Sequence, residues 1–182
     1  MGRDQTDERD QWRTVVRDRP ESIERPGPGE ESVWDYPRPP VVEPVSQRIR
    51  VEFGAATIAD TRRALRVIET ASPPTYYIPA EDVRMEFLVR HEATTFSEWK
   101  GVARYWSIRV GARQAERAAW SYPRPEQGFE AIRNHVAFFA GRVDECRVGD
   151  EIVIPQPGDY FGGWITSKIH GPFKGGPGTG NW

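Results

Sequence analysis

The sequence is poor in cysteine, histidine and lysine, and each shortage excludes a class of site. A single cysteine, Cys146, cannot form an internal disulfide. The three histidines, His91, His135 and His170, lie too far apart to match a zinc-ligand spacing, so we expect no metal and no cofactor. Only three of the 25 basic residues are lysines, and the other 22 are arginines. Each lysine therefore stands out against the composition.

Long hydrophobic runs and a strong net charge are also missing. No apolar stretch approaches the roughly 20 residues of a membrane-spanning helix, and the first residues are charged where a signal peptide would be apolar. The net charge of −2 provides no basic field for a phosphate backbone. We therefore expect a cytoplasmic protein that binds neither membrane nor nucleic acid.

The length of 182 residues predicts one main domain with extensions, and 16 prolines and 17 glycines suggest that much of the chain is loop. Residues 1–32 mix charge with proline and glycine and predict a flexible charged tail. A proline-rich lead-in is expected over 33–47 and a β core over 48–145. Residues 146–182 predict a hairpin followed by a wrapping segment of glycine, proline and aromatic residues.

Alternation with a period of two dominates the middle of the chain. In RIRVEF, Ile49, Val51 and Phe53 share one face, which predicts a half-buried strand over 48–53. The same reasoning predicts strands in GAATIADT, RALRVIET, YYIP, VRMEFL, RYWSIRV, QAERAAW, VAFFAGRVDECRV and DEIVIP. Only residues 125–136 carry helical spacing, after Pro125. The fold class is therefore mainly β with one short helix.

The hexapeptide Trp-x-Tyr-Pro-Arg-Pro occurs twice, starting at Trp34 and at Trp120. Its flanking sequences differ, which argues against an internal duplication. Prolines stiffen the backbone and so present the Trp and Tyr rings at low entropic cost. We predict that the first copy clasps the start of the core and that the second shapes the rim of a pocket.

Two of the three lysines follow an aromatic residue and precede a glycine, in EWKG at Lys100 and in PFKG at Lys174. An ammonium group can hold an anion, or act as a nucleophile once burial lowers its pKa. The alternative is a lysine whose stem packs beside the ring while its charge stays in water.

Aromatic residues and carboxylates complete the candidate site. Many rings fall in loops or at strand ends, where a pocket wall would use them. Asp82 and Glu86 could supply an acid or base, or simply form an ion-pair ladder with Arg84. The candidate ligand-binding residues are Tyr77, Asp82, Glu86, Trp99, Lys100, Tyr105, Trp106, Trp120 and Tyr122.

Several motifs in order, among them PPTYYIPAEDVRMEFL, TTFSEWKGVARYWSIRV and YFGGWITSKIHGPFKGGPGTGNW, resemble a bacterial family of unknown function over residues 33–182. That family is sometimes labelled nucleotidyltransferase-like. The resemblance implies a β-tent of two antiparallel sheets, as in the drug-binding domain of cereblon, Yippee-like proteins and B-type methionine sulfoxide reductases. The zinc cysteines of those relatives are absent here, and Ser97 replaces a cysteine found in many family members.

Three functions remain open at this stage. The first is a small-molecule-binding module whose aromatic pocket includes Lys100. The second is an enzyme acting on a carbonyl or phosphoryl substrate through Lys100, with Asp82 or Glu86 as the base. The third is a protein-interaction module, in which residues 34–44 or the tail meet a partner or a second copy of the chain.

Overall fold

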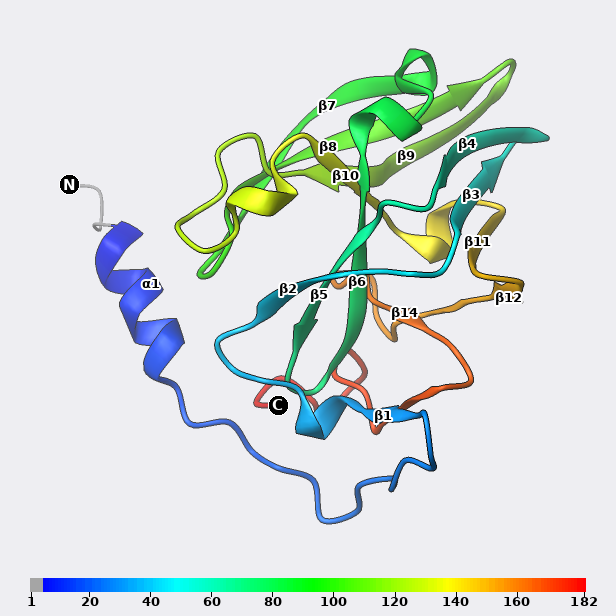
Figure 1. The fold of residues 1–182 in the computed structure, drawn as a ribbon. Helices are drawn as coiled ribbons and strands as arrows, with labels where there is room; N and C mark the ends of the chain where they lie inside the picture. Colours follow the sequence, from blue (N-terminus) through cyan, green and yellow to red (C-terminus); the bar gives the residue numbers. More distant parts are fainter. Residues whose placement is uncertain (1–4) are drawn as a thin grey trace.

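The computed structural model describes residues 5–182 and shows a chain built mainly of strands (Figure 1). One α-helix, α1 (Gln5–Thr14), lies within the predicted tail, and short 3-10 turns interrupt the later chain. The strands are β1 (Glu31–Ser32), β2 (Val41–Pro44), β3 (Ile49–Phe53), β4 (Ala56–Thr61), β5 (Leu65–Glu69), β6 (Ser72–Pro79), β7 (Leu88–Ser97), β8 (Gly101–Val110), β9 (Arg113–Ser121), β10 (His135–Phe138), β11 (Glu145–Val148), β12 (Glu151–Ile152), β13 (Ile154–Pro155), β14 (Trp164–Ile165) and β15 (Ile169–His170).

Two antiparallel sheets form the body. Seven strands pair in the order β2-β5-β6-β10-β9-β8-β7, and four pair in the order β12-β11-β3-β4. The hairpin β3-β4 turns at Gly54, and β11-β12 turns at Gly149 and Asp150, as the sequence predicts. The prediction of a mainly β chain with two antiparallel sheets is confirmed. Kinship with the tent-shaped folds stays a prediction.

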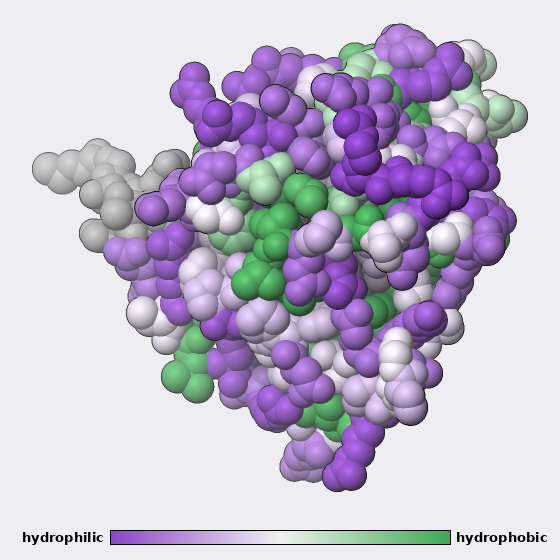
Figure 2. Space-filling model, in the orientation of Figure 1, coloured by the Kyte–Doolittle hydropathy of each residue, from purple (hydrophilic) through white to green (hydrophobic). Residues whose placement is uncertain are grey.

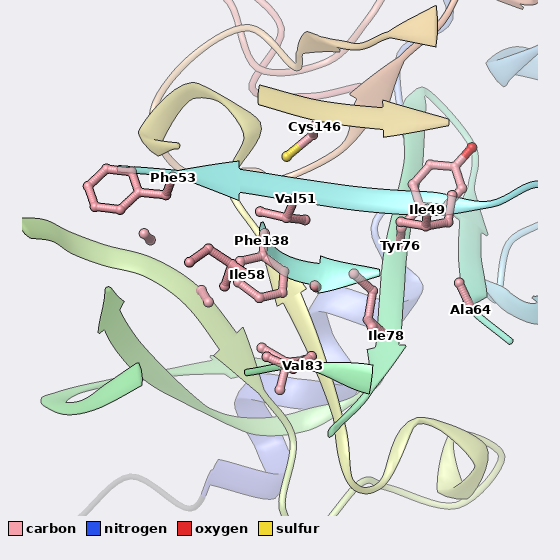
Figure 3. Close-up of a cluster of buried hydrophobic side chains, with 14 of the residues drawn as sticks. Ile49, Val51, Phe53, Ile58, Ala64, Tyr76, Ile78, Val83, Phe138 and Cys146 are labelled. Carbon is pink, nitrogen blue, oxygen red and sulfur yellow. The ribbon is translucent and has the colours of Figure 1, made fainter. Parts of the chain in front are cut away.

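The larger hydrophobic cluster lies between the two sheets (Figure 3). Ile49, Val51 and Phe53 of β3 point into it, together with Ile58 of β4 and Phe138 of β10. Their period of two matches the alternation in RIRVEF, because successive side chains of a strand point to opposite faces. Burial of these side chains is the main force that holds the two sheets together.

A second hydrophobic cluster covers the opposite face of the seven-stranded sheet. Neighbouring residues point to opposite faces of the sheet: Tyr76 and Ile78 belong to the first cluster and Tyr77 to the second. In the same way Ala119 faces the first cluster and Trp120 the second. This second face carries the candidate site.

The prediction of a helix over 125–136 is wrong. The segment contains only a 3-10 turn, Glu130–Ile132, after Gly128 with a φ of +90°. Asn134 has a φ of +59°, a left-handed conformation that a helix cannot continue through. Phe129 and Ile132 are both buried, so their spacing of three residues reflects a 3-10 turn that gives the same contact as a helix.

The prediction of a strand in VRMEFL is also wrong. A 3-10 turn, Met85–Phe87, takes its place after an earlier one, Ala80–Asp82, and a single bridge joins Val83 to Ala59 of β4. Val83 is nevertheless buried in the first cluster, and Met85 and Phe87 pack against it. The alternation therefore indicated the correct buried side chains but not the correct backbone.

Segments from the two ends of the sequence meet at the base of the molecule. β1 pairs in parallel with β15, with Glu31 opposite Ile169. Figure 1 shows the blue N-terminal segment passing beneath the body to reach the orange and red C-terminal segment. The His170 ring bridges Glu24 and Glu30, at 3.2 and 2.8 Å, and Asp18 N donates to Asn181 O at 2.9 Å. This seam holds residues 18–32 of the predicted tail.

Polar residues dominate the face seen in Figure 2, where hydrophobic residues form a central patch and smaller scattered groups. Within residues 5–182 no helix has the length and apolar character needed to cross a membrane. No three His, Cys, Asp or Glu side chains in that part of the chain cluster as metal ligands would.

Candidate ligand-binding site

A cavity of about 160 Å³ opens on the second face of the seven-stranded sheet. Tyr77 of β6, Tyr105 of β8 and Trp120 of β9 form its floor. The β7-β8 turn contributes one wall, Gln156, residues 160–162 and Lys174 contribute a second, and Arg17 and Arg38 reach it from the N-terminal segment. Segments that lie far apart in the sequence therefore meet at one place.

The rings on the floor support one another. Trp120 lies 4.4 Å from Phe139 between ring centroids, and Tyr77 meets Trp120 edge to face at 6.3 Å. Tyr77 is 1% exposed, and burial raises the pKa of its hydroxyl. Burial also raises the pKa of Tyr122, so both phenols remain protonated at neutral pH. The floor is therefore rigid, aromatic and uncharged.

Trp120 is fixed from the other side by the C-terminal segment. A Cβ built on Gly162 would lie 2.1 Å from Cη2 of Trp120, so only glycine permits this approach. Gly163 is equally crowded, with the Gln156 side chain at 2.5 Å and the Pro73 carbonyl oxygen at 2.6 Å. The two glycines of YFGGWI thus allow the C-terminal segment to lie directly on the floor of the cavity.

Lys100 is placed by the β7-β8 turn. The Ser97 hydroxyl accepts hydrogen bonds from the backbone N–H groups of Trp99 and Lys100, at 3.3 and 3.2 Å. Gly101 follows with a φ of +92°, which favours glycine. Lys100 Nζ lies 5.9 Å from the Tyr122 ring centroid, and burial lowers the pKa of the ammonium group. Ser97 therefore acts here as a turn-forming residue.

Lys174 lines the same cavity as Lys100. Its Nζ donates to the main-chain oxygen of Trp182 at 2.8 Å and lies 5.4 Å from the Phe161 ring centroid. Burial, followed by repulsion from Arg17, lowers the pKa of this ammonium group. The two lysines that share an aromatic-Lys-Gly context, 74 residues apart in sequence, thus meet at one site.

Arg38 brings the first hexapeptide to the cavity. Its guanidinium pairs with Glu69 at 2.6 Å and with Glu98 at 3.5 Å. Arg38 also lies 5.5 Å from the Trp99 ring centroid, and Arg13 of α1 lies 4.9 Å from it. The wall beside the β7-β8 turn therefore combines cations with the two carboxylates that line the cavity.

The two hexapeptides play different parts. Trp34 is buried against Trp182, and its Nε1 donates to the Pro172 oxygen at 2.8 Å, so this ring joins the C-terminal segment. That the first copy clasps the start of the core stays a prediction. The hydroxyl of Tyr36 donates to Glu31 at 2.7 Å. In the second copy Trp120 and Tyr122 both line the cavity, with Trp120 in its floor and not at its rim.

Comparison with known families decides the kinship. Residues 41–149 match the family described as "Domain of unknown function (DUF427)". This chain belongs to the DUF427 family. No curated protein sequence matches it. The DUF427 region supplies the sheet and the Lys100 turn, whereas Arg17, Arg38, residues 160–162 and Lys174 come from outside the matched region.

Six of the nine predicted site residues line the cavity of this DUF427 protein. They are Tyr77, Trp99, Lys100, Tyr105, Trp120 and Tyr122. Trp106 does not, because it neighbours Tyr105 on β8 and so points to the opposite face, where its Nε1 donates to Ser121 Oγ at 3.0 Å. The alternation in RYWSIRV already separates the two rings.

Asp82 and Glu86 also lie outside the cavity, which corrects their predicted place beside Lys100. Asp82 accepts hydrogen bonds from Thr61 at 2.6 Å and from Arg63 at 2.8 Å, and these bonds lower its pKa. Glu86 pairs with Arg84 at 2.8 Å in water. The two 3-10 turns of this segment carry both carboxylates away from the cavity floor.

Sequence reasoning missed the carboxylates that do reach the cavity, Glu69 and Glu98, as well as Arg17 and Arg38. Glu69 follows the buried Val67 by two residues on β5, but the register shifts between them, so simple alternation does not place its side chain. The arginines carried no signal, because 22 of them occur in the chain.

Proposed function

We propose that this DUF427 protein is a binding module for a small molecule, held between aromatic walls and Lys100 in the cavity on the second face of the seven-stranded sheet. The observation that supports this most directly is the convergence of six predicted residues on one cavity, with the half-buried Lys100 at its wall. Rings fixed by their neighbours present a preformed apolar surface, which is typical of small-molecule sites. We also propose a cytoplasmic location in a bacterium.

The size of the cavity limits the ligand. Typical drug-sized ligands occupy roughly 300–1,000 Å³, whereas a cavity of about 150 Å³ holds a molecule the size of benzene. At about 160 Å³, this cavity suits a molecule with a single ring or a short chain. Larger ligands such as nucleotides would require the walls to move apart.

A thermal-shift screen of small metabolites tests the proposal, because a ligand that binds only the native state stabilises it. At a concentration of 100 Kd the gain is about 2.7 kcal/mol, or roughly 5–10 °C for a chain of this length. Lys100→Ala should abolish the shift, and Lys168→Ala, which changes an exposed lysine, should keep it. Trp120→Phe and Trp106→Phe form a second matched pair. Shifts that are equal in both members of each pair would contradict the proposed site.

The geometry gives less support to the two other functions. The acid–base role of Asp82 or Glu86 fails because neither lines the cavity with Lys100. In the proline-rich segment Trp34 and Tyr36 are buried within the chain itself, so these rings are not exposed to a partner. Partners at other surfaces, including a second copy, stay a prediction.

A further inference from the structure

Several residues that line the cavity carry a buried polar atom without a hydrogen-bond partner. Among residues 5–182 these atoms include Nε of Arg17, Nε of Arg38 and Nε1 of Trp99. All three nitrogens can only donate a hydrogen bond. A buried donor without a partner is unfavourable by about 1–3 kcal/mol, so each would gain from an acceptor oxygen brought against the wall.

The charges that line the cavity have the same preference. Arg17, Arg38, Lys100 and Lys174 are its cations, and Glu69 and Glu98 are its only acids within the described chain. Arg38 already pairs with both carboxylates. Arg17 and the two lysines form no close ion pair with Glu69 or Glu98, which attract the two lysines only at longer range. A negative charge in the cavity would therefore lie near three cations.

Volume and ring geometry specify the remainder of the ligand. The floor of Tyr77, Tyr105 and Trp120 offers aromatic ring surfaces, and the space of about 160 Å³ fits one ring. Flat rings stack favourably on aromatic side chains. One end of the cavity thus suits a planar ring, and the donor-rich wall suits an oxyanion.

We infer that the ligand is a small monocarboxylate that carries a single planar ring, with its carboxylate facing Lys100, Lys174 and Arg17. This inference rests on the proposed function and narrows it to one ligand class. The three cations hold the carboxylate, and the ring lies on Trp120. Part of the recognition comes from Arg17 and Lys174, outside the region matched to the family.

Calorimetric titration with benzoate and benzamide tests the charge, because the two molecules share a ring and a shape and differ in charge. We expect benzoate to bind at least about tenfold more tightly than benzamide, a difference of about 1.4 kcal/mol. Inorganic phosphate, an oxyanion without a ring, should compete only weakly. Equal binding of benzoate and benzamide would overturn the carboxylate, and phosphate competing as well as benzoate would overturn the ring.

Variants place the carboxylate within the cavity. Lys174→Gln should weaken benzoate binding by about tenfold and leave benzamide unchanged. Arg17→Gln should also weaken benzoate binding. Because Arg17 lies outside the sheets, we expect this variant to fold normally. Arg133→Gln, an exposed arginine remote from the cavity lining, is the matched control and should bind benzoate normally. Unchanged benzoate affinity in both cavity variants would overturn the assignment.

The outcomes separate this inference from the function on which it rests. Absence of benzoate binding up to about 10 mM would overturn the carboxylate class. If the thermal-shift screen still found a neutral ligand sensitive to Lys100→Ala, the binding function would stand. If neither experiment found a ligand, both the carboxylate inference and the proposed binding function would be overturned.

Discussion

Replacing Gly162 with alanine is the sharpest test of the packing described above. The new Cβ would lie 2.1 Å from Cη2 of Trp120, whereas carbon atoms in contact lie about 3.5 Å apart. The indole or the backbone must therefore move by roughly 1.4 Å. Trp120 cannot retreat freely, because Phe139 lies 4.4 Å away and Tyr77 meets it edge to face.

Such overpacking destabilises proteins by about 1–3 kcal/mol, and we expect the upper half of that range because the rings behind Trp120 are buried. For a chain of this length the melting temperature should fall by roughly 4–10 °C. Urea denaturation followed by circular dichroism measures the free energy of unfolding directly. Gly180→Ala, where the new Cβ would meet no atom within 4 Å, should change it by less than about 0.5 kcal/mol.

A double-mutant cycle identifies the cause. Trp120→Phe removes the part of the ring that the new methyl group meets, so Gly162→Ala should be at least about 1 kcal/mol less destabilising in that background. Additive effects of the two substitutions would show that the indole is not the obstacle. A Gly162→Ala protein as stable as the wild type would refute the close approach itself.

Three further predictions concern other parts of the molecule. Trp164→Phe should lower the free energy of unfolding, measured by urea titration, by about 2–4 kcal/mol, because it removes a buried hydrogen bond to the Phe138 oxygen. Trp12→Phe, at an exposed site, should change the free energy of unfolding by less than about 0.5 kcal/mol. Asp82 has a lowered pKa, so its contribution to the free energy of unfolding is complete above the unfolded pKa of about 3.9 and is lost as the pH falls through the folded pKa. Asp82→Asn should therefore weaken the dependence of stability on pH at acid pH. Lys100 also has a lowered pKa, so between its folded and unfolded pKa values the unfolded chain binds more protons, and stability rises with pH in that window. Lys100→Met should therefore be more stable than wild type at neutral pH. A lower denaturation midpoint for this variant would contradict the reasoning.

The sequence predicts the strands and the faces they bury more reliably than the loops between them. Alternation in RIRVEF and RYWSIRV identifies β3 and β8, because a half-buried strand needs opposite residues on opposite faces. It fails at 83–88 and 125–136, where isolated 3-10 turns bury the same residues that a strand or a helix would bury. Hydrophobic spacing alone cannot distinguish these backbones.

The site was predictable only in part. Rings and a rare lysine are visible in the composition, and six of the residues chosen on that ground share one cavity. The choice of Trp106 ignored the alternation on β8, and the choice of Asp82 and Glu86 depended on a strand that does not form. Arg17 and Lys174 reach the cavity through contacts between segments far apart in sequence, which no local pattern records.

The seam between the chain ends bears on how a ligand could enter and leave. Arg17 and Lys174 belong to segments held together by the β1-β15 pair, by His170 with its two glutamates and by single backbone hydrogen bonds. None of these contacts is part of the two large sheets. Opening the seam would therefore free the segments that carry Arg17 and Lys174 while the sheets stay paired, at a lower free energy than global unfolding. The residence time of a ligand would then depend on the strength of the seam, and substitutions at His170 would change dissociation rates without touching the ligand.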